Sequence, residues 1–284
     1  MTSPSVSVLV CSKNGGIKLA RMLQSLQMQD LPLVEIILID DGSDPPLALP
    51  FAGIHLIRND RSLGLISCRN NLAALAKGDW LVFLDDDVIL DDAQLLSKAM
   101  SLVAKDAAVG ALGFMQRGVD GKLLDLQPGR GNQTGQVPVY YGWAHIIRRS
   151  AWLKAGPFAE VFGYGWEETE FCLRLLNCGY KVICDPGLAV IHDVASVSKN
   201  LASRHFMNDR NMLMTIVLHH PARLVPSWFK GALLHCRPDS SSRERLVLYR
   251  LRLLCAVALK IPYLLAHRQP VSKQTLDAFY QLHK

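Results

Sequence analysis

The chain has 284 residues, of which 50% are hydrophobic, so it can bury a large core and is a little long for one compact domain. Its seven cysteines form no Cys-x-x-Cys pair, which disfavours a zinc site and indicates reduced cysteines in a cytosolic protein. The net charge is +6, and the basic surplus lies in the tail, because residues 221–284 hold eleven Lys or Arg against three Asp or Glu.

The first predicted unit is a strand followed by a loop and a helix. Residues 6–11 form a short apolar run, and residues 12–16 form a polar turn that contains two glycines. Four apolar residues then repeat at helical spacing, namely Leu19, Met22, Leu23 and Leu26.

Three further strands follow in the first third of the chain. Residues 35–39 lead into the acidic segment 40–44, residues 55–57 form a third strand, and residues 62–77 have helical periodicity. The apolar run 80–84 forms the fourth strand. Strands that alternate with helices predict an α/β fold with right-handed crossovers and a mostly parallel sheet whose loops line one edge.

Asp85, Asp86 and Asp87 directly follow the fourth strand. Three adjacent carboxylates repel one another, and a divalent cation held by oxygen ligands would relieve that repulsion. The alternative is a solvated acidic turn that caps a helix beginning near Asp91. We therefore expect a metal site at this edge of the sheet.

Two strands that end in acids, together with the loop Ser12-Lys13-Asn14, favour a nucleotide pocket, because carboxylates accept hydrogen bonds from bases and ribose hydroxyls. The chain has no Gly-x-Gly-x-x-Gly after its first strand and no Gly-Lys-Ser/Thr loop, which disfavours a dinucleotide enzyme and a P-loop ATPase. Bound phosphates would then need a metal and basic side chains for neutralisation.

Residues 118–138 are predicted to form a mobile loop over the site. Asp120-Gly121 is a turn signal between short strands, and residues 128–135 contain almost nothing apolar to bury.

The tail begins near Pro221 and is predicted to be helical. Residues 225–234 and 246–265 have helical periodicity, and Pro262 interrupts the second run. Basic residues stand among the apolar ones in this part of the chain, namely Arg243, Arg245, Arg250, Arg252 and Lys260. Such helices suit the surface of an anionic membrane, and the alternative is an appendage packed on the main domain. A nucleic-acid partner is disfavoured, because the tail contains no recognised nucleic-acid module.

The N-terminus lacks a basic segment, and no apolar run is long enough to span a bilayer. These features predict a cytoplasmic protein. The basic tail adds the expectation that the protein binds peripherally to the inner face of the cell membrane.

A series of short motifs resembles the inverting family 2 glycosyltransferases of the GT-A fold. The first half contributes Ser12-Lys13-Asn14, Asp40-Asp41-Gly42-Ser43, Asn59 with Gly64, Cys68-Arg69-Asn70, Gly78-Asp79-Trp80 and Asp85-Asp86-Asp87. The second half contributes residues 142–160, residues 165–175, Ile191-His192 and Asp209-Arg210-Asn211. Residues 165–175 are similar to the family's Glu-Asp-x-Asp-Leu-x-x-Arg helix. The match covers roughly residues 5–215, and the order and spacing of the motifs make it specific.

The resemblance implies a donor site. Asp40 would bond the nucleobase beside residues 12–14 and Gly42, and Asp85 would contact the ribose next to Asp86. Arg69 would reach the base or the phosphates, and a solvated salt bridge on a helix surface is the alternative for it.

The resemblance also implies a cofactor. Asp87, with Asp85 and His192, would bind Mn²⁺ or Mg²⁺ at the diphosphate, since the leaving nucleoside diphosphate needs its charge neutralised. A structural role is the alternative for His192.

Glu168 is expected to be the catalytic base that takes a proton from the acceptor hydroxyl, and Glu167 and Glu170 are alternatives. The family usually has Asp at the position of Glu168. Three acids at the start of a helix also complement its dipole, which is the simpler explanation for them. Tyr141, Trp143 and Trp166 are expected to contact the acceptor sugar, unless they only fill the core.

The resemblance therefore predicts a GT-A domain at residues 1–220, with a nucleotide-sugar half at about 1–90 and an acceptor half at about 91–220. Residues 221–284 would be a basic, amphipathic helical appendage. The implied reaction moves a sugar with inversion from a UDP-, dTDP- or GDP-sugar to a saccharide or lipid-linked acceptor, in bacterial cell-surface polysaccharide synthesis. The rival hypotheses are a sugar nucleotidyltransferase and a non-catalytic saccharide-binding protein with a vestigial site.

Overall fold

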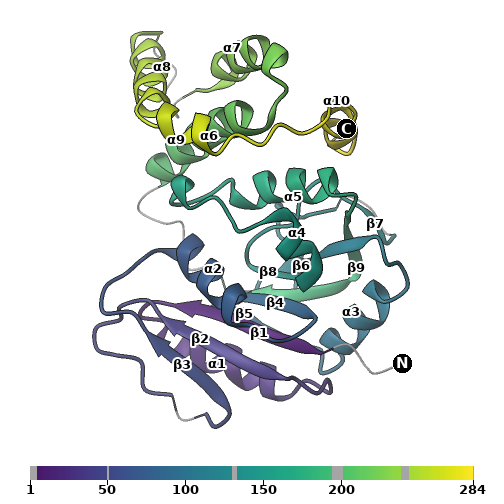
Figure 1. Ribbon diagram of the computed structural model, residues 1–284. Helices are drawn as coiled ribbons and strands as arrows, with labels where there is room; N and C mark the ends of the chain where they lie inside the picture. The colour runs from purple at the N-terminus through teal and green to yellow at the C-terminus, as the bar shows by residue number, and fades with distance from the viewer. Residues whose placement is uncertain (1–4, 50, 130–132, 194–200, 238–242, 284) are drawn as a thin grey trace.

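The computed structural model describes residues 5–49, 51–129, 133–193, 201–237 and 243–283. Part of the predicted loop 118–138, namely residues 130–132, lies outside the described residues, as does the side chain of the tail residue Arg243. A sheet flanked by helices forms the N-terminal two thirds, and further helices stack on one side of it (Figure 1).

The sheet contains nine strands among the described residues. They are β1 Val6–Ser12, β2 Glu35–Asp40, β3 Ile54–Arg58, β4 Trp80–Asp85, β5 Val88–Ile89, β6 Val109–Arg117, β7 Gly135–Gln136, β8 Ala144–Arg148 and β9 Lys181–His192. Their order is β3-β2-β1-β4-β8-β6-β9-β5, with β7 paired to β9.

The first four strands are mutually parallel, and β6 pairs in parallel with β9. β8 is antiparallel to both of its neighbours, β4 and β6, so those two strands share a direction. The predicted α/β fold with a mostly parallel sheet is confirmed. The antiparallel pairings, those of β8 and those of the short strands β5 and β7 with β9, are the part that alternation of strands and helices did not predict.

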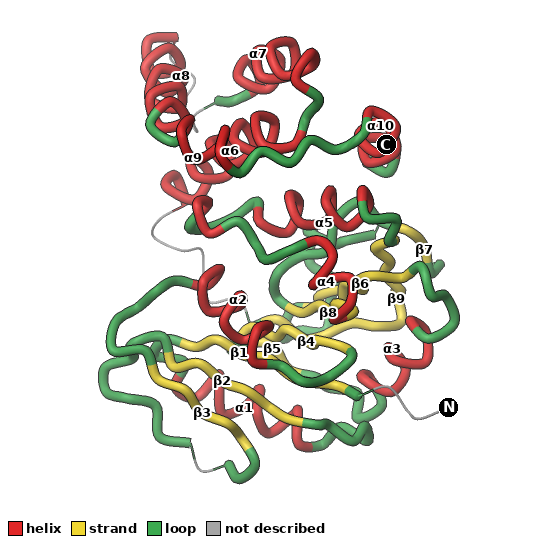
Figure 2. The backbone as a smooth tube through the Cα atoms, viewed as in Figure 1, coloured by secondary structure: helices red, strands yellow, loops and turns green. Residues whose placement is uncertain are grey.

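Helices cover both faces of the sheet (Figure 2). The helices of this part are α1 Gly16–Gln27, α2 Leu65–Leu75, α3 Leu95–Val103, α4 Arg149–Ala155 and α5 Glu167–Asn177. Strand β1 shows how two cores arise, because Leu9 packs in the cluster with α2, α4 and α5 while Val8 and Val10 pack in the cluster with α1 and α3. Successive strand residues point to opposite faces, so a fully apolar strand needs cover on both.

The parallel register brings three strand ends to one edge. Ser12 at the end of β1 is level with Asp40 of β2, and Cys11 is level with Asp85 of β4. The predicted convergence of acid-tipped strands is therefore present in the sheet.

The C-terminal part is helical, and helices are present where they were predicted at residues 225–234 and 246–265, whereas the helices at 201–219 and 273–281 were not predicted. Its helices are α6 Leu201–His219, α7 Val225–His235, α8 Arg243–Ala258, α9 Ile261–Ala266 and α10 Lys273–Gln281. The second predicted run is divided into α8 and α9, with Pro262 in the first turn of α9, where its missing N–H breaks no helical hydrogen bond. Buried Leu253, Leu264 and Phe279 join the same core cluster as α5, so one face of the tail packs on the main domain.

Candidate active site

Three of the predicted metal ligands meet at the edge of the sheet. Asp85 ends β4, Asp87 follows two residues later, and His192 ends β9, which pairs with the short strand β5 just after Asp87. Their potential ligand atoms all lie within 4.8 Å of one another. His192 Nε2 is 3.2 Å from Asp87 Oδ1. Two carboxylates and an imidazole are a donor set that suits Mn²⁺ or Mg²⁺.

A residue that sequence reasoning missed orients His192. The Oε1 of Gln116, on β6, lies 2.7 Å from His192 Nδ1, while its Nε2 donates to the Leu126 carbonyl at 2.8 Å. Because Oε1 is the acceptor end of the amide, the contact suits the tautomer of His192 that donates from Nδ1, with Nε2 facing Asp87. This tautomer fits a metal ligand, because ligating histidines commonly donate their other N–H to a fixed acceptor.

Asp86 points away from that group toward β1. The Ser12 hydroxyl donates to Asp86 Oδ2 at 2.5 Å. Burial, with the neighbouring charges of Asp87 and Asp85, raises the pKa of Asp86 to about 6 in spite of this hydrogen bond. Ser12 is buried and Lys13 is exposed, so Ser12 faces the acidic group while Lys13 faces the solvent.

Arg69 joins the acidic edge to the start of α5. Its side chain is 4% exposed, with Nη2 at 3.0 Å from Asp85 Oδ1 and Nη1 at 3.5 Å from Glu168 Oε1. Burial opposes its charge, but Asp85, Glu168 and Glu167 together raise the pKa of Arg69. The alternative of a solvated surface salt bridge is wrong for Arg69, because α2 presents this side chain inward.

The loop after Tyr141 is shaped by the same contacts. The Gly142 carbonyl accepts a hydrogen bond from Arg69 Nη2 at 2.8 Å. A Cβ at position 142 would lie 2.4 Å from Glu168 Oε1, so only glycine allows the backbone to approach the carboxylate this closely.

Glu167 and Glu168 open α5 and both border the cavity described below. Burial, reinforced by Glu168, raises the pKa of Glu167 to about 8, and its buried Oε2 has no hydrogen-bond partner among the described residues. Burial also raises the pKa of Glu168, with Arg69 opposing the shift. A raised pKa makes a carboxylate a stronger base when it is ionised.

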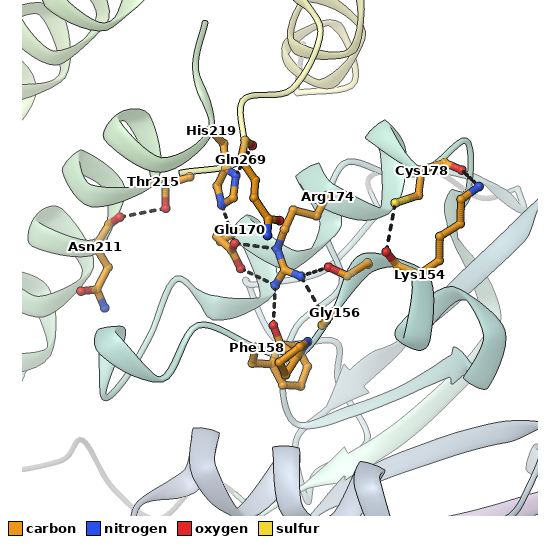
Figure 3. Close-up of polar contacts among 12 residues, drawn as sticks. Lys154, Gly156, Phe158, Glu170, Arg174, Cys178, Asn211, Thr215, His219 and Gln269 are labelled. Atoms are coloured by element: carbon orange, nitrogen blue, oxygen red, sulfur yellow. Dashed lines mark hydrogen bonds and ion pairs between the residues drawn. The ribbon is translucent and has the colours of Figure 1, made fainter. Parts of the chain in front are cut away.

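Both carboxylate oxygens of Glu170 are engaged by Arg174 and His219 (Figure 3). Its two oxygens accept hydrogen bonds from Arg174 Nε at 2.6 Å and Nη2 at 2.8 Å, and His219 Nε2 on α6 lies 2.6 Å from Oε1. Burial disfavours its charge, but Arg174 and His219 outweigh burial and lower the pKa of Glu170 to about 2. The suggestion that Glu170 is an alternative base is therefore at odds with this geometry, which ties α5 to α6.

The motif residue Asn211 supports the segment that leads into α5. Its buried side chain donates to the carbonyls of Tyr164 at 2.9 Å and Gly165 at 2.8 Å. Trp166 follows with a positive φ of 70°, a conformation that needs such support in a bulky residue. Asn211 thus fixes the turn that sets the direction of Glu167 and Glu168.

The predicted base-binding residues lie at the end of β2. Asp40 is buried and accepts hydrogen bonds from the backbone N–H of Ser43 at 2.8 Å and of Leu47 at 3.1 Å, and from Arg58 at 2.5 Å. These donors lower the pKa of Asp40 against the effect of burial. Both oxygens therefore close the turn after β2, and nucleobase binding by Asp40 stays a prediction.

Gly42 and Asn14 lie in the loops that follow β2 and β1, next to Asp40. Gly42 has a φ of +73°, and a Cβ there would lie 2.8 Å from the Ser62 nitrogen. The Asn14 Oδ1 accepts the Asp44 N–H at 2.9 Å, and the Ser43 hydroxyl accepts the Asn14 N–H at 2.9 Å. These bonds connect the loops after β1 and β2 into one surface beside the acids.

A cavity of about 1380 Å³ opens in front of Asp85, Arg69 and Glu168. The three aromatic residues predicted at the acceptor site line it, and the rings of Tyr141 and Trp143 stack at 4.9 Å. Residues 126–129 and 136–139 border it as well, so the described parts of the predicted loop lie beside the site. Its far wall comes from the tail, with Trp228 of α7 and Tyr280 of α10.

Comparison with known proteins agrees with this geometry. The family model described as Glycosyl transferase family 2 matches residues 7–162. A pre-mycofactocin glycosyltransferase of Mycobacterium tuberculosis is 24% identical over 249 residues, which cover 81% of this chain and 51% of that protein. The chain thus spans about half the length of this relative.

Two solved structures share the fold. A mannosyltransferase from Pyrobaculum calidifontis, in complex with GDP-Man and Mn²⁺, aligns with a TM-score of 0.60 and 18% identity over 100% of this chain and 85% of its own. S. aureus TarS, in complex with UDP-GlcNAc, aligns with a TM-score of 0.64 and 15% identity over 89% of this chain and 81% of its own. At such identities the likeness shows the GT-A fold alone.

Proposed function

Because the chain belongs to glycosyl transferase family 2 and is a glycosyltransferase, we propose that it transfers a sugar with inversion from a nucleoside-diphosphate sugar to an acceptor hydroxyl, with a divalent cation. The observation that carries the proposal is the bridge made by Arg69. This buried cation contacts Asp85 of the potential metal group and Glu168 at the start of α5. The metal group that would bind the donor and the carboxylate that would act on the acceptor would then both contact the same arginine.

Asp85, Asp87 and His192 would hold Mn²⁺ or Mg²⁺. When bound, the cation supplies positive charge that stabilises the leaving diphosphate. Asp86, held by Ser12, would stay beside the donor, and the joined loops at Asn14 and Gly42 would form the floor for the nucleotide. The mannosyltransferase and TarS are described with GDP-Man and UDP-GlcNAc, which supports a nucleoside-diphosphate sugar without selecting the base or the sugar.

Glu168 would act as the base. In a direct displacement the acceptor oxygen bonds to the anomeric carbon while the bond from that carbon to the diphosphate breaks, and Glu168 takes the hydroxyl proton. The raised pKa of Glu168 favours this role. Arg69 would hold the carboxylate in place between turnovers, and the fixed turn at Trp166 limits its movement.

The acceptor would occupy the cavity between α5 and the tail. Tyr141 and Trp143 offer stacked rings near Asp85, and Trp166 borders the cavity beside Glu168. Because α7 and α10 complete the far wall, we propose that the predicted boundary near residue 220 separates two parts of one binding site. A saccharide, free or lipid-linked, and a role in bacterial cell-surface polysaccharide synthesis stay predictions.

The family match argues against a sugar nucleotidyltransferase. A vestigial site is the second rival, and donor hydrolysis that requires both a metal and Glu168 would argue against it. No described helix has the length and the apolar character needed to cross a membrane.

Calorimetry with nucleoside diphosphates in the presence and absence of Mn²⁺ tests the proposal. Asp87→Ala should abolish the metal-dependent tightening of diphosphate binding, because it removes one of three clustered ligands. Asp92→Ala is the matched control, since it removes the same charge five residues away, at a carboxylate that pairs with Lys98. Unchanged metal dependence in Asp87→Ala would show that this cluster is not the metal site.

A further inference from the structure

The helix α8 has an apolar face that the protein core does not use. Its inner face is buried through Leu253 and Val257. On the opposite side, Leu248 is 60% exposed and Leu251 is 52% exposed. Exposed apolar side chains spaced three, four and seven residues apart share one side of a helix. They continue past the end of α8, where Leu259 is 82% exposed.

We call this surface the outer stripe, which consists of Val247, Leu248, Leu251, Leu254, Leu259 and Leu265. A monomeric protein seldom leaves a contiguous row of large apolar side chains in water unless the row binds something. α8, which carries most of this row, lies at the end of the molecule away from β2 and β3 (Figure 1).

After Glu244, the charged residues in the sequence of α8 and α9 are all basic. Residues 245–276 contain six Lys or Arg and no Asp or Glu. Arg245, Arg252 and Lys260 are exposed, and the first two lie seven residues apart along the edge of the stripe. The guanidinium carbon of Arg252 lies 5.3 Å from the centre of the Phe206 ring, which holds this charge at the edge of α8.

We propose that α8 and α9 dock the protein on an anionic lipid bilayer. The outer stripe would enter the boundary between headgroups and acyl chains, and the basic edge would contact anionic headgroups. The alternative occupant is a second copy of the chain. A two-fold contact through the stripe would bring two identical basic edges together, and their repulsion disfavours it. An anionic surface complements both the apolar row and its charges.

Sedimentation with lipid vesicles tests the proposal on the full chain. The protein should bind equimolar phosphatidylglycerol and phosphatidylcholine vesicles about tenfold more tightly than pure phosphatidylcholine vesicles, and added salt should weaken the binding. Leu248→Glu with Leu251→Glu should abolish binding to both. Arg252→Glu with Lys260→Glu should remove the preference for the anionic vesicles.

The matched control is Leu75→Glu with Leu153→Glu, two helix residues that are 47% and 65% exposed outside the tail. This control should bind vesicles like the unsubstituted chain. The leucine variants should keep the melting temperature of that chain, because each substituted leucine is exposed, and the melting temperature of Arg252→Glu with Lys260→Glu reports how much the contact with Phe206 contributes. Failure of the unsubstituted chain to bind anionic vesicles would overturn the proposal, as would equal loss of binding in the control. Light scattering that shows a dimer, converted to monomer by Leu248→Glu with Leu251→Glu, would assign the stripe to contacts between copies instead.

Discussion

Gln116 fixes the ring of His192, with 2.7 Å between Gln116 Oε1 and His192 Nδ1. The two residues lie on the neighbouring strands β6 and β9, near the ends at which Arg117 is level with Ile191. The pairing of these strands therefore places an amide directly behind the imidazole that faces Asp87. An acceptor held by the sheet orients the ring more firmly than a water molecule would.

Gln116→Met should weaken metal binding roughly tenfold to a hundredfold, because methionine keeps the approximate size of the side chain but accepts no comparable hydrogen bond from Nδ1. The measurement is the Mn²⁺ dependence of nucleoside diphosphate binding by calorimetry. The decisive control is a double-mutant cycle with His192→Ala. If Gln116→Met weakens binding equally in the His192→Ala background, Gln116 does not act through that histidine.

Glu170→Gln should destabilise the fold by about 3 to 5 kcal/mol, because it leaves the buried Arg174 without its charged partner. Urea denaturation measures the change in the free energy of unfolding. The matched control is Asp277→Asn in the pair with Lys273, whose side chains are both 56% exposed. An exposed pair contributes less than about 1 kcal/mol. Equal effects in the two variants would contradict the structural role given to Glu170.

The same carboxylate predicts an acid limit to stability. Folding lowers the pKa of Glu170 from 4.5 to about 2. A carboxylate with a lowered pKa stabilises the folded state fully above its unfolded value, and this contribution is lost as the pH falls from 4.5 toward 2. Melting temperatures measured across that window should fall less steeply in Glu170→Gln than in the unsubstituted chain. Parallel curves would indicate that other carboxylates dominate.

Much of the fold follows from local pattern. The strands that end at Ser12, Asp40 and Asp85 were predicted from apolar runs that stop at polar residues, and parallel pairing then requires their ends to meet. The antiparallel β8 was not predictable in this way, because residues 144–148 carry no signal for the direction in which a strand enters a sheet.

The residues of the candidate site were likewise predicted where a local pattern marks them and missed where a distant contact defines them. The acids and His192 were found because carboxylates and imidazoles carry recognisable chemistry at strand ends. Gln116 and His219 were missed, since each acts through a contact made across 76 or 49 residues of sequence, and no short motif marks such a partner. The contribution of α7 and α10 to the cavity wall likewise depends on how distant helices pack.

Glu168→Gln should reduce turnover roughly a hundredfold to ten-thousandfold and leave the affinity for the donor unchanged, because the carboxylate would act on the acceptor hydroxyl in the transition state. Glutamine keeps the size of the side chain and can still face Arg69, so donor binding reports an intact site. Turnover with a donor and acceptor pair, together with calorimetry of the diphosphate, separates the two quantities.

Glu167→Gln is the matched control, since it replaces the neighbouring carboxyl group in the same turn of α5 and in contact with the same Arg69. Its effect on turnover should be much smaller if Glu168 alone accepts the proton. Equal losses in the two variants would mean that the charge at the start of α5, and not one base, supports the reaction. Loss in Glu167→Gln alone would move the base to Glu167, whose buried Oε2 has no hydrogen-bond partner in the part of the chain that the structure describes.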